Sequence, residues 1–179
     1  MTDQDTPGDE PPSRSPAGPP VSLDVCVVDV LDATSLAPAA LVQSLAERLR
    51  RAMVELRAAG ELRVRIVADS EMTVLHATHK KDATTTDVLT FDLSNGSGGL
   101  DVDVVVCLDE AHRQAAARGH DAGDELLLYA LHGALHCLGF DDASEDESAR
   151  MHEEEDRVLN AIGVGAVFGR PVLDRGDAR

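Results

Sequence analysis

The segment from Asp124 to Leu138 constrains the fold more than any other, because it has the length of a helix of about four turns and is apolar on nearly all sides. A helix of this kind is stable in water only when other elements bury it. Aromatic residues make up 2% of the chain and hydrophobic residues 43%, so Leu, Val and Ala have to build the core around it. We therefore expect a globular domain organised around this segment.

The flanking sequence predicts strands and further helices in an order that does not alternate strictly. Apolar residues at alternate positions indicate the strands, and Ser144 to Glu147 form a capping box that opens a last helix. The other expected elements are a strand from Ser22 with Leu23, Val25 and Val27, a helix opened by Pro38 and closed by Gly60, a strand with Leu62, Val64 and Ile66, a short helix from Asp69 or Ser70 to about His79, strands at 87–91 and 102–107, and a helix capped by Asp109 that ends at Gly119. This order predicts an α+β fold, a single domain in which about five helices pack on a mostly four-stranded mixed sheet.

Both ends of the chain are expected to lie outside this domain. Residues 1–20 hold six of the eight prolines together with Gly, Ser and acidic residues, and they have almost nothing to bury. Such a composition is typical of disordered segments. We therefore expect a disordered tail at 1–20, a folded domain at 21–169 and a short tail at 170–179.

Charge and cysteine content narrow the classes of function. The formal net charge of −17 disfavours non-specific nucleic-acid binding, so an RNA-directed role needs a local basic feature or a partner that delivers the substrate. The arginines between residues 48 and 65 are interleaved with Glu47, Glu55 and Glu61, which indicates a salt-bridged surface.

The three cysteines are scattered, and the sequence has neither an apolar signal region nor a run of 18 apolar residues. We expect a cytoplasmic protein that does not span a membrane.

Two histidines, His132 and His136, interrupt the apolar segment four residues apart. Side chains at i and i+4 leave the same face of a helix one turn apart, so both imidazoles can bind one metal ion. The alternative is a pair of core histidines that bond to backbone carbonyls. Asp141 and Asp142 follow in the next turn, and two histidines with one carboxylate are a common catalytic zinc set that leaves a position for water.

The residue after His132 is Gly133, where a zinc protease of the His-Glu-x-x-His type has its general-base Glu. The literal protease motif is therefore excluded. A glycine at this point of a buried helix instead permits the close approach of a neighbouring element or of a substrate backbone.

Several segments resemble the YbeY family. Residues 132–142, HGALHCLGFDD, are similar to the family signature HGxLHLxGYDH, and residues 86–91, TDVLTF, are similar to its TDVLSF block. Residues 103–107, DVVVC, resemble its GDIVIC strand, and Met151 and Glu155 fall where the family has Met and Glu in its last helix. The resemblance covers about residues 23–165. It implies a metal-dependent, single-strand-specific endoribonuclease that acts in the maturation of small-subunit rRNA and in ribosome quality control.

Two positions differ from the family pattern. Asp142 stands where the family has its third histidine ligand, and Lys80 aligns with the arginine of the family's cleft. The resemblance therefore implies one Zn²⁺ held by His132, His136 and Asp142, with Lys80 as the catalytic cation that stabilises phosphate charge. Lysine keeps the charge of the arginine but loses its bidentate fork.

Other polar residues nearby carry weaker expectations. His152, one or two turns into the last helix, competes with Asp142 as the third ligand. Asp141 is expected to orient a histidine ring by a hydrogen bond to the ring nitrogen that does not bind the metal. His112 and His120 lie on or just past a polar helix and are expected to be exposed.

Two other functions remain open on the sequence. A non-catalytic ribosome-assembly factor would hold the metal as a structural ion, and the missing His and Arg favour it. The second alternative is a metal-dependent hydrolase of another bond, such as a peptide bond. This chain has no Glu after His132, which counts against that alternative. In the endoribonuclease interpretation the partners are an RNA substrate, specifically rRNA, and a ribosomal subunit or its assembly factors.

Overall fold

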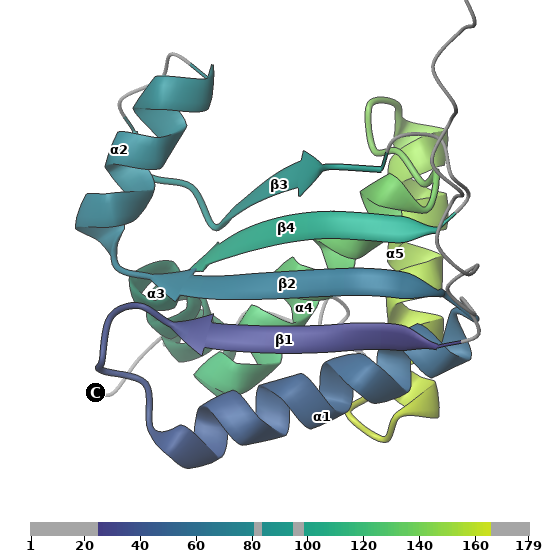
Figure 1. Ribbon diagram of the computed structural model, residues 1–179, viewed down its shortest axis with the longest axis horizontal. Helices are drawn as coiled ribbons and strands as arrows, with labels where there is room; N and C mark the ends of the chain where they lie inside the picture. Colours follow the sequence, from purple (N-terminus) through teal and green to yellow (C-terminus); the bar gives the residue numbers. More distant parts are fainter. Residues whose placement is uncertain (1–24, 81–83, 95–98, 166–179) are drawn as a thin grey trace, which may run out of the picture.

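A mixed sheet of four strands forms the frame of the molecule (Figure 1). The computed structural model describes residues 25–80, 84–94 and 99–165, so the expected tails at 1–20 and 170–179 lie outside the described residues. The elements in chain order are β1 (Cys26–Asp32), α1 (Ala39–Glu55), β2 (Gly60–Val67), α2 (Asp69–Lys80), β3 (Val88–Asp92), β4 (Leu100–Cys107), α3 (Leu108–Arg118), α4 (Ala122–Cys137) and α5 (Glu145–Ala161). The predicted α+β fold, with a four-stranded mixed sheet and five helices, is confirmed over these ranges.

The strand order is β1-β2-β4-β3. β1, β2 and β4 are parallel, and β3 runs antiparallel to β4 at the edge. Thr90 of β3 pairs with Val104 of β4, which in turn pairs with Val64 of β2. Because paired residues point to the same face of a sheet, these three positions define the face that the buried helix covers.

The two faces of the sheet carry separate hydrophobic clusters. On the inner face, alternate residues of β2 and β4 such as Val64 and Val104 pack against α1, α3, α4 and α5, and Figure 1 shows α3, α4 and α5 behind the sheet. On the outer face, Met72 and Leu75 of α2 pack with Leu89 and Val105. Successive side chains of a strand point to opposite faces of the sheet. The helix α2 therefore packs on the outer face, and the other four helices pack on the inner face.

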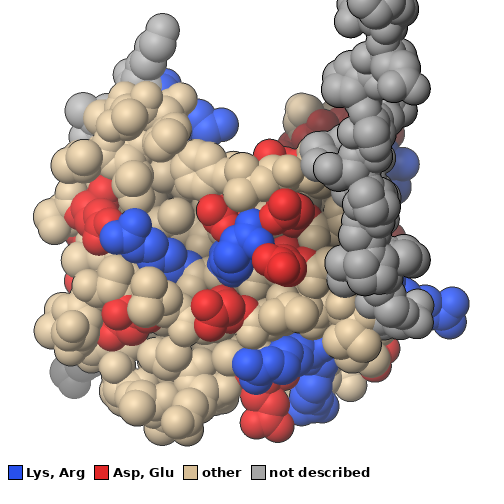
Figure 2. All heavy atoms as spheres, in the orientation of Figure 1, with Lys and Arg blue, Asp and Glu red and all other residues tan. Residues whose placement is uncertain are grey.

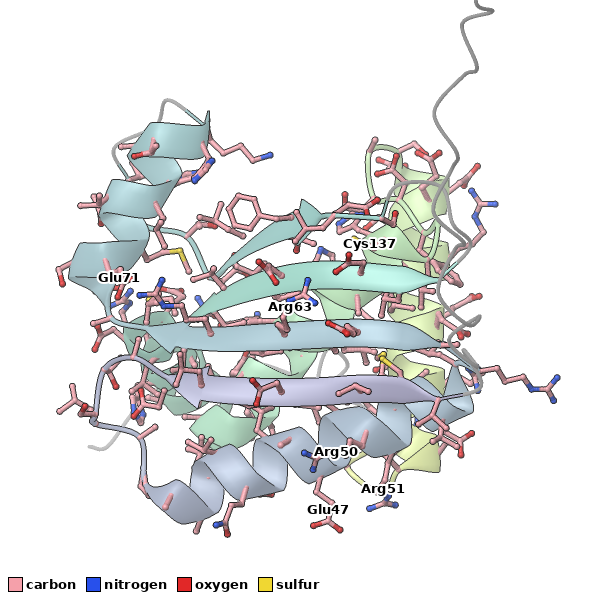
Figure 3. All side chains as sticks on the ribbon, viewed as in Figure 1. Glu47, Arg50, Arg51, Arg63, Glu71 and Cys137 are labelled. Carbon is pink, nitrogen blue, oxygen red and sulfur yellow. The ribbon has the colours of Figure 1, made fainter. Side chains whose placement is uncertain are left out.

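The exposed part of the outer face carries a charged network. The guanidinium of Arg63 on β2 bonds to the carboxylates of Glu61, Asp101 and Asp103 at 2.6, 2.5 and 2.5 Å. Figure 2 shows basic atoms enclosed by acidic ones at the centre of this face, and Figure 3 labels Arg63 there. The expected salt-bridged surface is confirmed for Arg63, so its charge is largely neutralised by neighbours.

The first strand differs from the sequence prediction in which face is buried. Cys26 and Val28 are 7% and 4% exposed and face the core, whereas Val25 and Val27 are 68% and 62% exposed. The predicted Leu23 lies outside the described residues. Apolar residues occupy both parities in this segment, so alternation alone does not identify the inner face, and a shift of one residue exchanges the two.

Two predicted boundary signals act differently in the structure. α1 ends at Glu55, before the predicted stop at Gly60, and the left-handed residue after it is Arg57. Gly60 begins β2 with φ of 126°, where a Cβ atom would lie 2.0 Å from the carbonyl oxygen of Leu100. Asp109 does not cap α3, because its carboxylate accepts a hydrogen bond from the backbone nitrogen of Asp69 at 2.8 Å.

The central helix α4 is buried as the sequence predicts. Its first turn is capped by the Asp121 carboxylate, which accepts a hydrogen bond from Gly123. A Cβ atom on Gly133 would lie 2.4 Å from the hydroxyl oxygen of Thr90 and 3.2 Å from a methyl carbon of Val104. Gly133 therefore permits the close approach of a neighbouring element, the β3–β4 pair. No helix in the described ranges has the length and hydropathy needed to cross a bilayer.

Replacing Gly133 with alanine tests how closely α4 lies on the sheet. Alanine favours a helix by about 1 kcal/mol over glycine. We nevertheless expect Gly133→Ala to lower the free energy of unfolding by about 1 kcal/mol or more, because the added methyl overpacks the contact with Thr90. Urea unfolding measures this, and Thr90→Ala in the same chain should restore part of the loss. An increase in stability from Gly133→Ala would contradict the packing.

Candidate metal centre

The side chains of His132 and His136 meet on the last turns of α4. Their Nε2 atoms lie 3.0 Å apart, and the two rings are nearly perpendicular at 87°. The side chains are 22% and 32% exposed, so both reach solvent from an otherwise buried helix. The two imidazoles therefore converge on one point, as the spacing of four residues predicts.

Glu155 on α5 fixes the orientation of the first ring. The Nδ1 atom of His132 donates a hydrogen bond to a carboxylate oxygen of Glu155 at 2.8 Å, and Glu155 has no exposed surface. An ionised carboxylate can only accept, so the proton of neutral His132 is on Nδ1 and a lone pair is on Nε2.

The turn after α4 fixes the orientation of the second ring. The Nδ1 atom of His136 donates a hydrogen bond to the carbonyl oxygen of Phe140 at 3.2 Å. Gly139, with φ of 94°, turns the chain so that this carbonyl comes back beside the helix. A carbonyl can only accept, so neutral His136 also presents a lone pair on Nε2.

Two lone pairs that face each other at 3.0 Å repel unless a proton or a metal ion lies between them. Two nitrogen ligands at about 2.0–2.1 Å from a tetrahedral zinc lie about 3.3 Å apart, close to the observed spacing. The described residues therefore fit a metal ion bound by His132 and His136.

Asp142 completes the group. Its carboxylate oxygens lie 3.6 Å from Nε2 of His132 and 3.8 Å from Nε2 of His136. One donor atom from each of the three residues lies within 4.8 Å of the other two, and His152 does not belong to this group. The Asp142 side chain is 45% exposed, so the third side of the group is open to solvent.

Asp141 does not have the expected role of orienting a histidine ring. Its carboxylate accepts a hydrogen bond from the backbone nitrogen of Asp142 at 2.8 Å and so shapes the turn. Glu155 takes the expected place behind His132. The sequence carried a signal for this, because Glu155 falls on the buried stripe of α5 with Met151 and Val158.

Negative charge around His132 favours a cation at this point. Burial of the imidazole acts to lower its pKa, but the hydrogen bond to Glu155 and the charges of Glu155, Asp142 and Asp87 outweigh burial and raise the pKa above its usual value. The same carboxylates that favour a proton on the ring favour a divalent metal in its place.

Lys80, at the end of α2, lines the same cleft as the two histidines. This cleft has a volume of about 450 Å³ and is also lined by Thr90 and Asp92 of β3. The structure therefore brings the ammonium-bearing side chain predicted to contact phosphate to the cleft above the candidate metal ligands.

A second group of possible ligands, Asp69, Cys107 and Asp109, has a different explanation. Arg113 bonds to both oxygens of Asp69 at 2.7 and 2.8 Å, and this pairing lowers the pKa of Asp69 to about 2. Burial raises the pKa of the Cys107 thiol to about 11, so it stays protonated. The group is an ion pair with a protonated thiol, and all three cysteines of the chain are free.

A family model described as Endoribonuclease YbeY matches residues 31–163. The chain belongs to the YbeY family. A Staphylococcus aureus protein named Endoribonuclease YbeY is 32% identical over 149 residues, which cover 76% of this chain and 96% of that protein. A Macrococcus caseolyticus YbeY protein is 32% identical over 113 residues, or 59% of this chain and 73% of its own length.

The solution structure of a Thermotoga maritima protein has a similar fold, with a TM-score of 0.57 and 23% sequence identity. The match covers 75% of this chain and 88% of that chain. This likeness shows the fold alone. The YbeY resemblance inferred from three sequence segments is confirmed by the family model and by the Staphylococcus aureus relative.

The choice between Asp142 and His152 as the third ligand is open to a direct test. We expect Asp142→Ala to weaken zinc affinity about tenfold or more, since even ~1.4 kcal/mol from the lost contact gives this factor. Asp142→His should keep the affinity or raise it, because imidazole suits zinc well. His152→Ala should leave it unchanged. Competition with a chelator measures all three, and weaker binding in His152→Ala but not in Asp142→Ala would move the ligand to α5.

Proposed function

We propose that this protein is a metal-dependent endoribonuclease that cleaves single-stranded RNA, acts in the cytoplasm in rRNA maturation and ribosome quality control, and holds one Zn²⁺ through His132, His136 and Asp142. Its membership of the YbeY family supports the endoribonuclease activity, because the related proteins carry that name. The ribosomal subunit or its assembly factors are the further partners of this proposal.

The observation that carries the proposal is the convergence of three donor groups at an open cleft. A structural zinc site is closed by four protein ligands, whereas a catalytic site has three and leaves a position for water. The group found among the described residues has three members, and Asp142 is 45% exposed on its open side. The donor set therefore favours the catalytic kind of site.

The chemistry divides between the ion and the side chains around it. A zinc ion held by His132, His136 and Asp142 would lower the pKa of a bound water and polarise a phosphoryl oxygen. Glu155 holds His132 in the tautomer that presents Nε2, and the Phe140 carbonyl does the same for His136. Lys80 attracts the substrate phosphate to the cleft and stabilises the charge that develops on it.

The two rival functions fit the site less well. An assembly factor with a structural ion would need a fourth protein ligand, and the group of described residues offers three. A peptide hydrolase would need a general-base carboxylate beside the metal ligands. Glu155 is fully buried and already bonded to His132, and the position after His132 is Gly133, where the helix lies against β3.

A cleavage assay on a single-stranded RNA oligonucleotide tests the proposed function. We expect the zinc-loaded full chain to cut the RNA, and His132→Ala or His136→Ala to lower the rate at least about a hundredfold, because metal catalysis contributes several kcal/mol. Lys80→Ala should lower the rate, whereas Lys80→Arg should retain it.

The matched control is His112→Ala, which removes an exposed imidazole from α3 and should leave the rate unchanged. A chelator should abolish cleavage, and added zinc should restore it. Full activity of His132→Ala, or of the wild type in excess chelator, would overturn the proposed function.

A further inference from the structure

The cleft that contains the candidate metal ligands continues along the sheet. Its lining includes Asp92, the last residue of β3, and Cys137, the last residue of α4. A neighbouring hollow of about 440 Å³ is lined by the same two residues, and Figure 3 labels Cys137 beside the end of β3. The two hollows therefore adjoin, and together they form one groove, here called the β3 groove.

The β3 groove follows a free edge of the sheet. Within the described ranges β3 pairs with β4 on one side only, and Figure 1 shows it at the rim between α2 and the turn that precedes α5. The lining residues of this part of the chain extend from Val88 to Ser94. At about 3.3 Å per residue this segment is about 20 Å long, so the groove has room for several nucleotides of an extended strand.

Arg57 is exposed and lines the second hollow, whereas Lys80 lines the first. Most arginines in the described ranges form ion pairs with carboxylates, namely Arg48, Arg63, Arg65, Arg113, Arg118 and Arg157. Arg57 forms no ion pair with any residue that the structure describes. In a chain with a net charge of −17, its guanidinium is therefore a cation that remains available to a ligand.

The backbone of Arg57 makes the choice of an arginine unusual. The N–H of Arg57 bonds to the carbonyl of Val54, and the N–H of Ala58 bonds to the carbonyl of Met53, each at 3.0 Å. These two bonds form a Schellman motif at the end of α1, with Arg57 at the left-handed position, φ of 52°. Glycine is the usual residue there, because a Cβ atom makes this conformation unfavourable.

We propose that the β3 groove binds a single strand of RNA along the free edge of β3, and that Arg57 binds a phosphate of this strand further along than Lys80. The proposal rests on the proposed endoribonuclease function. The hollow with Lys80 also contains His132 and His136, so Lys80 acts near the scissile phosphate. The guanidinium of Arg57 has the planar, bidentate geometry that suits phosphate oxygens.

Asp92 lies at the junction of the two hollows. Its carboxylate accepts hydrogen bonds from the backbone nitrogen and the hydroxyl of Ser94 at 2.8 and 2.5 Å, and these bonds hold its pKa below the usual value. The carboxylate is therefore ionised at neutral pH and repels phosphate from the junction. We expect the contacted phosphates on either side of Asp92, one beside Lys80 and one beside Arg57.

The salt dependence of RNA binding tests the groove without reference to cleavage. The probe is a labelled single-stranded 2′-O-methyl RNA of about ten nucleotides, and fluorescence anisotropy gives its affinity for the full-length protein at several salt concentrations. Each phosphate contacted on a single strand contributes about 0.7 to the slope of log affinity against log salt. Arg57→Gln should lower this slope by about 0.7 and weaken binding about fivefold at low salt. Adding Lys80→Gln should lower the slope by about 1.4 in total, because the two side chains contact separate phosphates.

Arg51→Gln is the matched control. Figure 3 labels Arg51 on α1, near the opposite edge of the sheet from β3, and Arg51 lines neither hollow. This variant removes the same charge and should keep both the slope and the affinity. An equal loss in Arg51→Gln and Arg57→Gln would overturn the proposal, because the effect would then come from net charge alone.

Arg57→Gly separates RNA binding from a structural role of the arginine at the end of α1. Glycine suits the left-handed backbone, so this variant should keep or raise the melting temperature while its slope falls as in Arg57→Gln. A lower melting temperature with an unchanged slope would make Arg57 a helix-terminating residue and overturn the proposal.

The two proposals can fail separately. If the wild type cuts no RNA but Arg57→Gln alone lowers the salt slope, the endoribonuclease function fails and the RNA groove stands. If the wild type cuts RNA and Arg57→Gln keeps the slope, the groove proposal fails and the function stands.

Discussion

The hydrogen bond between Glu155 and His132 is the interaction on which the candidate site depends. Glu155 is completely buried, and a buried carboxylate is tolerated only when a partner compensates for its lost hydration. His132 is that partner, at 2.8 Å. The bond joins α5 to α4, and it also turns Nε2 of His132 towards His136. One contact therefore connects the packing of two helices with the direction of a candidate metal ligand.

The rigidity of the site comes from the way α4 lies on the sheet. Gly133 brings the helix close to Thr90 and Val104, so the neighbouring His132 is held at a fixed height above β3. The turn after α4 then places Phe140 behind His136 and Asp142 in front of it. Ligands on packed helices and a tight turn are held more precisely than ligands on a long loop, as a metal site requires.

Local patterns in the sequence were enough to predict the elements and the core of the site. The period of two in β2 and β4, the capping box of α5 and the histidine spacing on α4 all depend on neighbours along the chain. The features that sequence reasoning missed depend on contacts between distant residues. The buried face of β1 depends on which side the helices cover, and the burial of His120 depends on Glu125. The residue that orients His132 is Glu155 and not the expected Asp141. This too depends on a distant contact, because only the packing of α5 against α4 brings Glu155 beside the ring.

Charge around the centre explains how a strongly acidic chain can present an attractive site to an anionic substrate. The net charge of −17 repels RNA in general, and Arg63 is surrounded by acids (Figures 2 and 3). Attraction therefore has to be local, and a divalent ion beside Lys80 would supply it.

The metal content of the purified full-length protein tests the proposed metal centre at His132 and His136 most directly. We predict about one equivalent of zinc or another transition metal, lost in His132→Ala. Less than about a tenth of an equivalent in the wild type, prepared without chelator, would contradict a metal centre at His132 and His136.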